Sequence, residues 1–221
     1  MDQGTLDFDP EGQNLAQTAS LGSLVEFQPT IPGYALLERI GEGSFGEVWS
    51  ATQRSTGQKV AVKLLHRNDL GALSYLEREV SRLAGLGGNP HLLSLIDANL
   101  HHVPAFLVTP LLQQSLEQLM GQELTPRRAA RYFAEAASGL AYVHSRGILH
   151  CDLKPSNLLR DQEGRIRLVD FGQAQLLQQR GVSLGTLWYM PLEQLPLGSR
   201  PPQPEAAWDI YALGATFYTL L

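Results

Sequence analysis

A cluster of glycines between two strand-like segments constrains the fold most strongly. Gly41, Gly43 and Gly46 separate residues 34–40 from residues 47–51, and both flanking segments read as strands. A dinucleotide-binding glycine motif opens a helix, whereas a strand follows this one, so that class of fold is excluded. The glycines therefore predict a hairpin of an antiparallel sheet, whose backbone amides can approach phosphate groups without interference from Cβ atoms.

The next strand carries a lysine beside a small side chain. Residues 59–64 alternate, so Val60 and Val62 face one side of the sheet while Ala61 and Lys63 face the other. Because alanine is small, this face of the strand leaves room for a flat ligand, and the ammonium group of the lysine can lie under it.

A helix over residues 70–86 is predicted from an apolar stripe at helical spacing. Glu77 and Glu79 lie on different sides of this helix. Either can be the acidic partner of Lys63, depending on which side faces the sheet.

The following elements add short strands and then helices. Residues 92–96 and 105–109 are expected to be strands, and a serine can cap a short helix over residues 115–120. A capping threonine and a first-turn proline begin a longer helix over residues 125–145. Its buried positions are predicted to be Ala129, Phe133, Ala136, Leu140 and Val143.

Residues 150–159 carry the chemistry. Asp152 can accept a proton from a hydroxyl, Lys154 can neutralise a phosphate oxygen, and Asn157 offers an oxygen to a hard cation. Pro155 pushes the preceding residue out of the helical region, so an ordered loop is expected. Taken alone, the segment also fits an ordinary polar turn.

A hairpin over residues 157–160 and 165–169 follows the loop and ends at Asp170. Because Asn157 and Asp170 stand at the two ends of one hairpin, their side chains are predicted to meet as a Mg²⁺ pair. Strands thus come first and helices later, with polar residues where they meet, which predicts an α+β, two-lobed layout.

Composition excludes several classes of protein. The only cysteine, Cys151, rules out an internal disulfide and favours a reducing compartment, and no zinc-binding spacing is present. No apolar stretch is long enough to span a membrane and no signal peptide is evident, so we expect a cytoplasmic protein. Residues 1–30 hold five acidic residues and no lysine or arginine, which accounts for the net charge of −5. They predict a flexible acidic tail, and the neutral remainder argues against nucleic-acid binding.

Together these segments resemble the protein-kinase family, specifically the bacterial Ser/Thr kinases of the eukaryotic-like kind, over about residues 34–221. The resemblance rests on a series of motifs in the family's order: Gly41-x-Gly43-x-x-Gly46-x-Val48, Ala61-Val62-Lys63, His150-x-Asp152-Leu153-Lys154-x-x-Asn157, Asp170-Phe171-Gly172, and Gly185-Thr186 running to Glu193. It implies a two-lobed kinase domain over residues 31–221. An antiparallel sheet with one helix would occupy about 31–108, a hinge 109–112, and a mainly helical, partial lobe 113–221.

The resemblance implies ATP and Mg²⁺ as cofactors. The glycine hairpin would cover the phosphates, and Lys63 would hold the α- and β-phosphates while pairing with Glu79, with Glu77 as the fallback. The remaining nucleotide contacts would come from the adenine pocket and the residue that gates its back: Ile40, Val48, Ala61, Thr109, Leu112 and Leu159.

The same resemblance implies roles for the loop residues. Asp152 would deprotonate a serine or threonine hydroxyl of a protein substrate, and Lys154 would stabilise the transferring phosphoryl group. Asn157 and Asp170 would bind Mg²⁺, and Asp209 would brace the loop from below.

Two departures from the family pattern concern regulation and substrate. Cys151 replaces the arginine that usually pairs with a phosphorylated activation loop, and Arg180 is the only local cation that we identify for a phosphate on Ser183 or Thr186. We therefore expect activity without loop phosphorylation. The run from Met190 to Glu193 departs from the usual Ala-Pro-Glu ending, which suggests a different substrate platform.

A third departure is that the sequence stops inside a helix, before the last helices of the family. We expect this to expose Leu213, Phe217, Leu220 and Leu221, so that the chain is either an inactive truncated product or is covered there by a partner.

Two alternative functions follow from other readings of the motifs. One is a nucleotide-binding scaffold without activity, and the other is a small-molecule kinase of the antibiotic-phosphotransferase type.

Overall fold

The computed structural model describes residues 29–43, 46–65, 70–122, 124–176, 186–195 and 205–221. The predicted tail therefore lies almost wholly outside the described residues. Where the description begins, Ile31 is buried and bridges to Tyr34.

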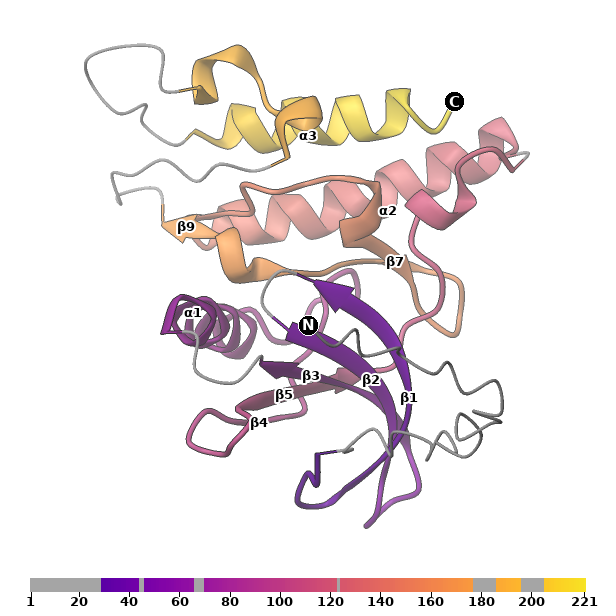
Figure 1. The fold of residues 1–221 in the computed structure, drawn as a ribbon. Helices are drawn as coiled ribbons and strands as arrows, with labels where there is room; N and C mark the ends of the chain where they lie inside the picture. The colour runs from indigo at the N-terminus through magenta and orange to yellow at the C-terminus, as the bar shows by residue number, and fades with distance from the viewer. Residues whose placement is uncertain (1–28, 44–45, 66–69, 123, 177–185, 196–204) are drawn as a thin grey trace, which may run out of the picture.

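A five-stranded antiparallel sheet forms the first lobe (Figure 1). Its strands are ordered β1-β2-β3-β5-β4, and the glycine hairpin joins the first two. On β3, Val60 and Val62 are fully buried while Ala61 and Lys63 are half-buried, as the alternation predicts. The strands are β1 (Tyr34–Gly43), β2 (Gly46–Gln53), β3 (Lys59–Leu65), β4 (Asp97–Asn99) and β5 (Phe106–Pro110).

Helix α1 (Leu70–Gly85) lies between this sheet and the second lobe. It packs against β3 and β5 and, most extensively, against the short 3₁₀ turn η3 (Phe171–Gln173). The helix therefore touches both lobes at the level where the predicted site residues lie.

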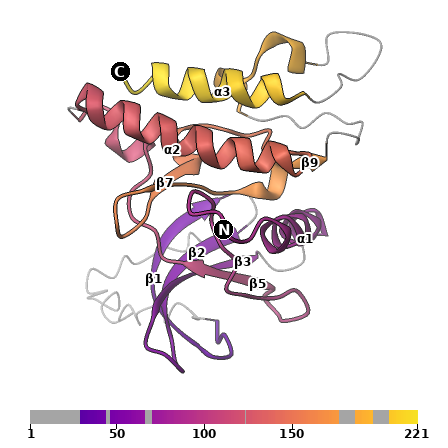
Figure 2. The same ribbon diagram turned by 180° about the vertical axis from the view of Figure 1, so that it is seen from behind.

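The second lobe is mainly helical. Helix α2 (Pro126–Ser145) begins where predicted, and Thr125 caps it by accepting a hydrogen bond from the Arg128 amide. Figures 1 and 2 show the small hairpin on the sheet side of α2 and helix α3 (Ala206–Tyr218) on the other side. The strand pairs are β7 (Leu158–Arg160) with β8 (Ile166–Leu168), and β6 (Ile148–Leu149) with β9 (Gln175–Leu176). The other 3₁₀ turns are η1 (Glu117–Leu119), η2 (Pro155–Asn157), η4 (Leu187–Tyr189) and η5 (Leu192–Gln194). The predicted α+β, two-lobed layout is confirmed.

The strand predicted at residues 92–96 is wrong. The start of this segment bonds to the second lobe, since the Leu93 amide donates to the Leu168 carbonyl at 2.9 Å and the Leu168 amide donates to the His91 carbonyl at 2.9 Å. Only its end reaches the sheet, where the Ile96 amide donates to the Val108 carbonyl of β5 at 2.8 Å. The outer strand of the sheet is the later β4. The apolar run at 92–96 thus links the lobes, a role that periodicity alone does not distinguish from a buried strand.

Two predictions of burial are also wrong. Phe133 is 42% exposed and Tyr132 is fully buried in its place, whereas the other four predicted positions on α2 are buried as expected. Leu213 and Phe217 on α3 are 4% and 6% exposed because they pack on the core around α2, and Leu220 is half-buried against the same core, while Leu221 is exposed as expected. Phe133 and Phe217 meet edge to face, with ring centroids 5.1 Å apart. In the part of the chain that the structure describes, no helix is long and apolar enough to cross a membrane.

Candidate active site

The lysine of β3 is paired with a glutamate of α1. Lys63 Nζ lies 2.6 Å from Glu79 Oε2, and the Glu79 side chain is only 3% exposed. Glu77 is exposed, so of the two glutamates the helix turns Glu79 toward the sheet. This contact fixes α1 against β3.

Lys63 also influences Asp170. Burial alone would lower the pKa of Lys63, but the negative charges of Glu79 and Asp170 outweigh burial and raise it. Burial would likewise raise the pKa of Asp170, yet the charge of Lys63 and a hydrogen bond from Tyr75 lower it. Burial raises the pKa of Glu79 despite Lys63. The two carboxyl groups near this ammonium group therefore differ in the direction of their pKa shift, because burial dominates at Glu79 and the positive charge of Lys63, with the Tyr75 hydrogen bond, dominates at Asp170.

The loop after β6 surrounds Asp152 with donors. Its Oδ2 lies 2.9 Å from Lys154 Nζ and accepts from Asn157 Nδ2 at 3.3 Å. Its Oδ1 accepts from the Thr186 amide at 2.9 Å and from the Thr186 hydroxyl at 3.1 Å. Lys154 also donates to that hydroxyl at 2.9 Å. The carboxylate is thereby held in one orientation, against Thr186, one of the two positions considered for a phosphate on the activation loop.

Asn157 and Asp170 stand at opposite ends of the β7–β8 hairpin, as predicted. The amide nitrogen of Asn157 donates to Asp152, which leaves its oxygen as the atom for a cation. An ionised carboxylate and an amide oxygen suit Mg²⁺, which takes few protein ligands and completes its shell with phosphate oxygens and water. Among the described residues no three His, Cys, Asp or Glu side chains form a metal site of their own. The donor set therefore fits a cation that arrives with a phosphate ligand.

The residues predicted to contact a nucleotide lie on both lobes. Strand register places Val48 opposite Gly41 and Lys63, and Ala61 opposite Thr109. Val48 and Ala61 are half-buried and leave apolar surface exposed beside Lys63. Thr109 is buried, and Ile40 is 47% exposed. Leu159 lies on β7, and Leu112 packs against the core of the second lobe.

The protein kinase domain family model matches residues 34–221. The chain belongs to the protein kinase domain family. The matched range includes all the strands and helices described above. Membership of this family supports phosphoryl transfer to protein substrates, with ATP and a divalent metal ion.

Asp209, on α3, holds the backbone immediately before Asp152. Its Oδ2 accepts from the His150 amide and lies near His144 Nε2, each at 2.8 Å, and its Oδ1 accepts from the Cys151 amide at 2.8 Å. Cys151 has a left-handed backbone, with a φ of 65° that is unfavourable for a residue with a side chain. The bonds from Asp209 stabilise this conformation immediately before Asp152.

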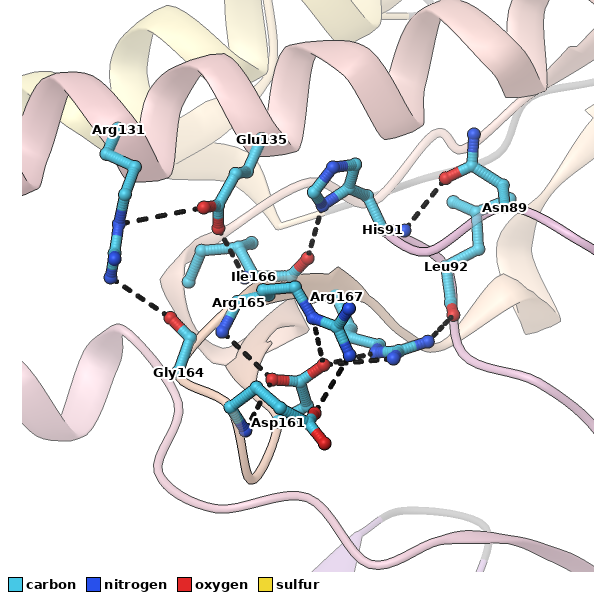
Figure 3. A network of polar contacts seen from close by, with 11 residues as sticks. Asn89, His91, Leu92, Arg131, Glu135, Asp161, Gly164, Arg165, Ile166 and Arg167 are labelled. Atoms are coloured by element: carbon cyan, nitrogen blue, oxygen red, sulfur yellow. Dashed lines mark hydrogen bonds and ion pairs between the residues drawn. The ribbon is translucent and has the colours of Figure 1, made fainter.

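A network of charged residues holds the hairpin that carries Asn157 and Asp170 (Figure 3). Asp161 accepts from the amides of Glu163 and Arg165 and from the guanidinium groups of Arg165 and Arg167. Burial alone would raise the pKa of Asp161, but these hydrogen bonds, the Arg165 amide first, lower it. Arg167 also donates to the Leu92 carbonyl, so the network ties the hairpin to the interlobe segment.

Replacing Asp161 with asparagine is expected to lower the free energy of unfolding by about 1–3 kcal/mol at pH 7. A carboxyl with a lowered native pKa stabilises the fold above its unfolded-state pKa of about 3.9 and loses that contribution as pH falls through the native value. The difference between D161N and the unmodified domain in urea unfolding should therefore shrink below about pH 4. E163Q removes an exposed ion pair to Arg165 and should change stability by less than about 1 kcal/mol. An equal effect of D161N at pH 3 and pH 7 would contradict the expectation.

Gly46 is required by the close approach of β2 and β3. A Cβ at this position would stand 1.9 Å from the Leu64 carbonyl oxygen, whereas a Cβ at Gly41 would meet only Val48 Cβ at 3.8 Å. G46A is therefore expected to destabilise the domain by about 1–3 kcal/mol or more in urea unfolding. G41A, a matched substitution in the same hairpin, should be neutral or stabilise by about 0.5–1 kcal/mol. Equal stability of the two variants would show that the strands separate freely.

Sequence reasoning missed two contacts of the site. Thr186 was considered only as a phosphorylation position without a local cation except Arg180, yet Lys154 contacts its hydroxyl directly. Ser183 and Arg180 lie outside the described residues. Tyr75 was not selected at all, although its hydroxyl donates to Asp170 Oδ1 at 2.5 Å. Its position one helical turn before Glu79 was the available signal.

Proposed function

We propose that this kinase domain transfers the γ-phosphoryl group of ATP to serine and threonine hydroxyls of proteins, with Asp152 as the base that accepts the hydroxyl proton. The observation that supports this most directly is the contact of Thr186 with Asp152 through both its amide and its hydroxyl. This contact brings backbone next to the base, so a bound peptide chain would also lie close to it. A short acceptor side chain suits that distance, whereas a tyrosine hydroxyl stands at the far end of its ring.

The other residues have complementary roles in the proposed reaction. Lys63 binds the nucleotide phosphates under the glycine hairpin, and Lys154 neutralises charge on the transferring phosphoryl group. Asn157 and Asp170 would hold Mg²⁺, which would supply positive charge to offset that of the phosphate groups. Asp152 needs no large movement, because four donors already orient its two oxygens.

We also propose that activity does not depend on phosphorylation of the activation loop. Cys151 is buried and uncharged at the position before the base, so it supplies no cation for a loop phosphate. A phosphate on Thr186 would place additional negative charge against Asp152 and take Lys154 from it. Phosphorylation there would therefore oppose catalysis.

Incubation with Mg·ATP and a mixture of protein substrates tests the first proposal. Phosphoserine and phosphothreonine are expected after acid hydrolysis of the labelled products, and a predominance of phosphotyrosine would contradict the assignment. Aminoglycosides in the same assay should remain unlabelled.

The second proposal is tested by phosphatase treatment of the purified domain, followed by removal of the phosphatase. The initial rate on an added substrate should stay within about twofold of the untreated rate. A loss of tenfold or more, restored by preincubation with ATP, would show that a loop phosphate is needed.

A further inference from the structure

Tyr75 connects helix α1 to the predicted metal ligand. It lies one helical turn before Glu79, so the two side chains leave the same face of the helix. Glu79 contacts Lys63, while the Tyr75 hydroxyl donates to Asp170 Oδ1 at 2.5 Å. One helix face therefore orients both a cation and a carboxylate of the catalytic centre.

The Tyr75 ring is also fixed in place by its packing. It is 5% exposed and covers Gly172, where an added Cβ would stand 2.0 Å from ring carbons Cε1 and Cζ. Lys63 Nζ lies 5.2 Å from the ring centroid on its face. The space above Gly172 is thus filled by this ring, and the hydroxyl has little freedom to choose another partner.

Asp170 needs such an anchor. Its backbone is left-handed, with φ 65° and ψ 69°, and a residue with a side chain holds that conformation only when its surroundings stabilise it. A hydrogen bond to one carboxylate oxygen leaves further lone pairs on both oxygens, so it orients the group without excluding a cation. Hydrogen-bonding partners of this kind around metal-ligating carboxylates commonly affect metal affinity tenfold to a hundredfold.

We propose that Tyr75 is a positioning residue for the divalent cation. Its hydroxyl sets the orientation of the Asp170 carboxylate, and its ring packs against Gly172 and fixes the backbone there. The inference rests on the proposed function, in which Asp170 is a metal ligand. The contact between Tyr75 and Asp170 also makes metal binding depend on the placement of α1. The same face of this helix carries Glu79, whose contact with Lys63 fixes the helix against the sheet.

Binding of Mn²⁺ to the purified domain in the presence of ADP, measured by the electron paramagnetic resonance signal of free Mn²⁺, tests the proposal without catalysis. Y75F keeps the ring and removes the hydroxyl, and is expected to raise the Mn²⁺ dissociation constant about tenfold to a hundredfold. ADP affinity without metal should change less than about twofold. Y142F is the matched control, since Tyr142 lies on α2 and its hydroxyl donates to the Gly87 carbonyl in the turn after α1; it should leave Mn²⁺ binding unchanged.

The outcomes separate this inference from the proposed function. Failure of the unmodified domain to bind Mn²⁺ with ADP, or binding that D170N does not weaken, would overturn the metal assignment itself. Binding that requires Asp170 but is equal or tighter in Y75F would overturn only the role of Tyr75, and tighter binding would identify the hydroxyl as a competitor of the metal. G172A provides a second variant, because its Cβ displaces the ring while the hydroxyl remains, and it should weaken Mn²⁺ binding in the same direction.

Discussion

Replacing Asp152 with asparagine is expected to lower kcat for phosphoryl transfer about 10²–10⁴-fold, the usual contribution of a positioned general base. Asparagine has nearly the same size as aspartate but cannot accept the hydroxyl proton. Its amide group would also face a donor whichever way it is turned, because Lys154 and Asn157 approach one oxygen and Thr186 approaches the other. The measurement is the steady-state rate with a peptide substrate at saturating Mg·ATP.

The affinity of D152N for ADP should remain within a few-fold of the unmodified domain, because no described contact joins Asp152 to the sheet that is proposed to bind the nucleotide. E163Q makes the same carboxylate-to-amide change on an exposed side chain of the same lobe and should keep full activity. Equal, slow transfer by D152N and the unmodified domain would mean that the chain binds nucleotide without catalysing transfer. Loss of both ADP binding and activity would point to misfolding instead of a lost base.

Much of the arrangement around Asp152 follows from local sequence. Glycines between two strands, a lysine alternating with buried valines and a proline after Lys154 each restrict the backbone strongly, and they predict the hairpin, the strand and the loop where the structure has them. Asn157 and Asp170 were predicted to meet because a hairpin returns the chain to its starting point, and β7 and β8 form that hairpin. These predictions depend on neighbours along the chain.

The errors concern contacts between segments that are distant in sequence. Residues 92–96 have the composition of a strand, but Leu93 bonds to Leu168 in the other lobe. On α2, Tyr132 and Phe133 are both aromatic and adjacent, and the elements packed against the helix decide which is buried. Tyr75 is ordinary in its own helix and acquires its partner from Asp170, far along the chain. Periodicity identifies a helix face but not what that face meets.

Replacing Asp209 with alanine is expected to lower the free energy of unfolding by about 3–5 kcal/mol, a large part of the stability of a typical domain. The carboxylate is 1% exposed and accepts from the amides of His150 and Cys151 while contacting His144. Without it, two buried amides lose their partner and the left-handed Cys151 loses the bond that holds it. Urea unfolding measures the loss, and kcat should fall with it even under conditions where the variant is folded, because Asp152 follows directly.

Two matched variants separate the buried network from a general effect of removing a carboxylate. D209N retains one oxygen that can accept one of the two amides, so its stability should lie between those of D209A and the unmodified domain. D97A removes an exposed carboxylate that accepts from the Tyr34 hydroxyl at 3.0 Å and from the exposed amide of its neighbour Ala98 at 2.8 Å, and it should cost about 1 kcal/mol or less. If D209A were no less stable than D97A, the catalytic loop would be held mainly by the packing of Leu149 and Leu153 in the core, and its left-handed turn would not need Asp209.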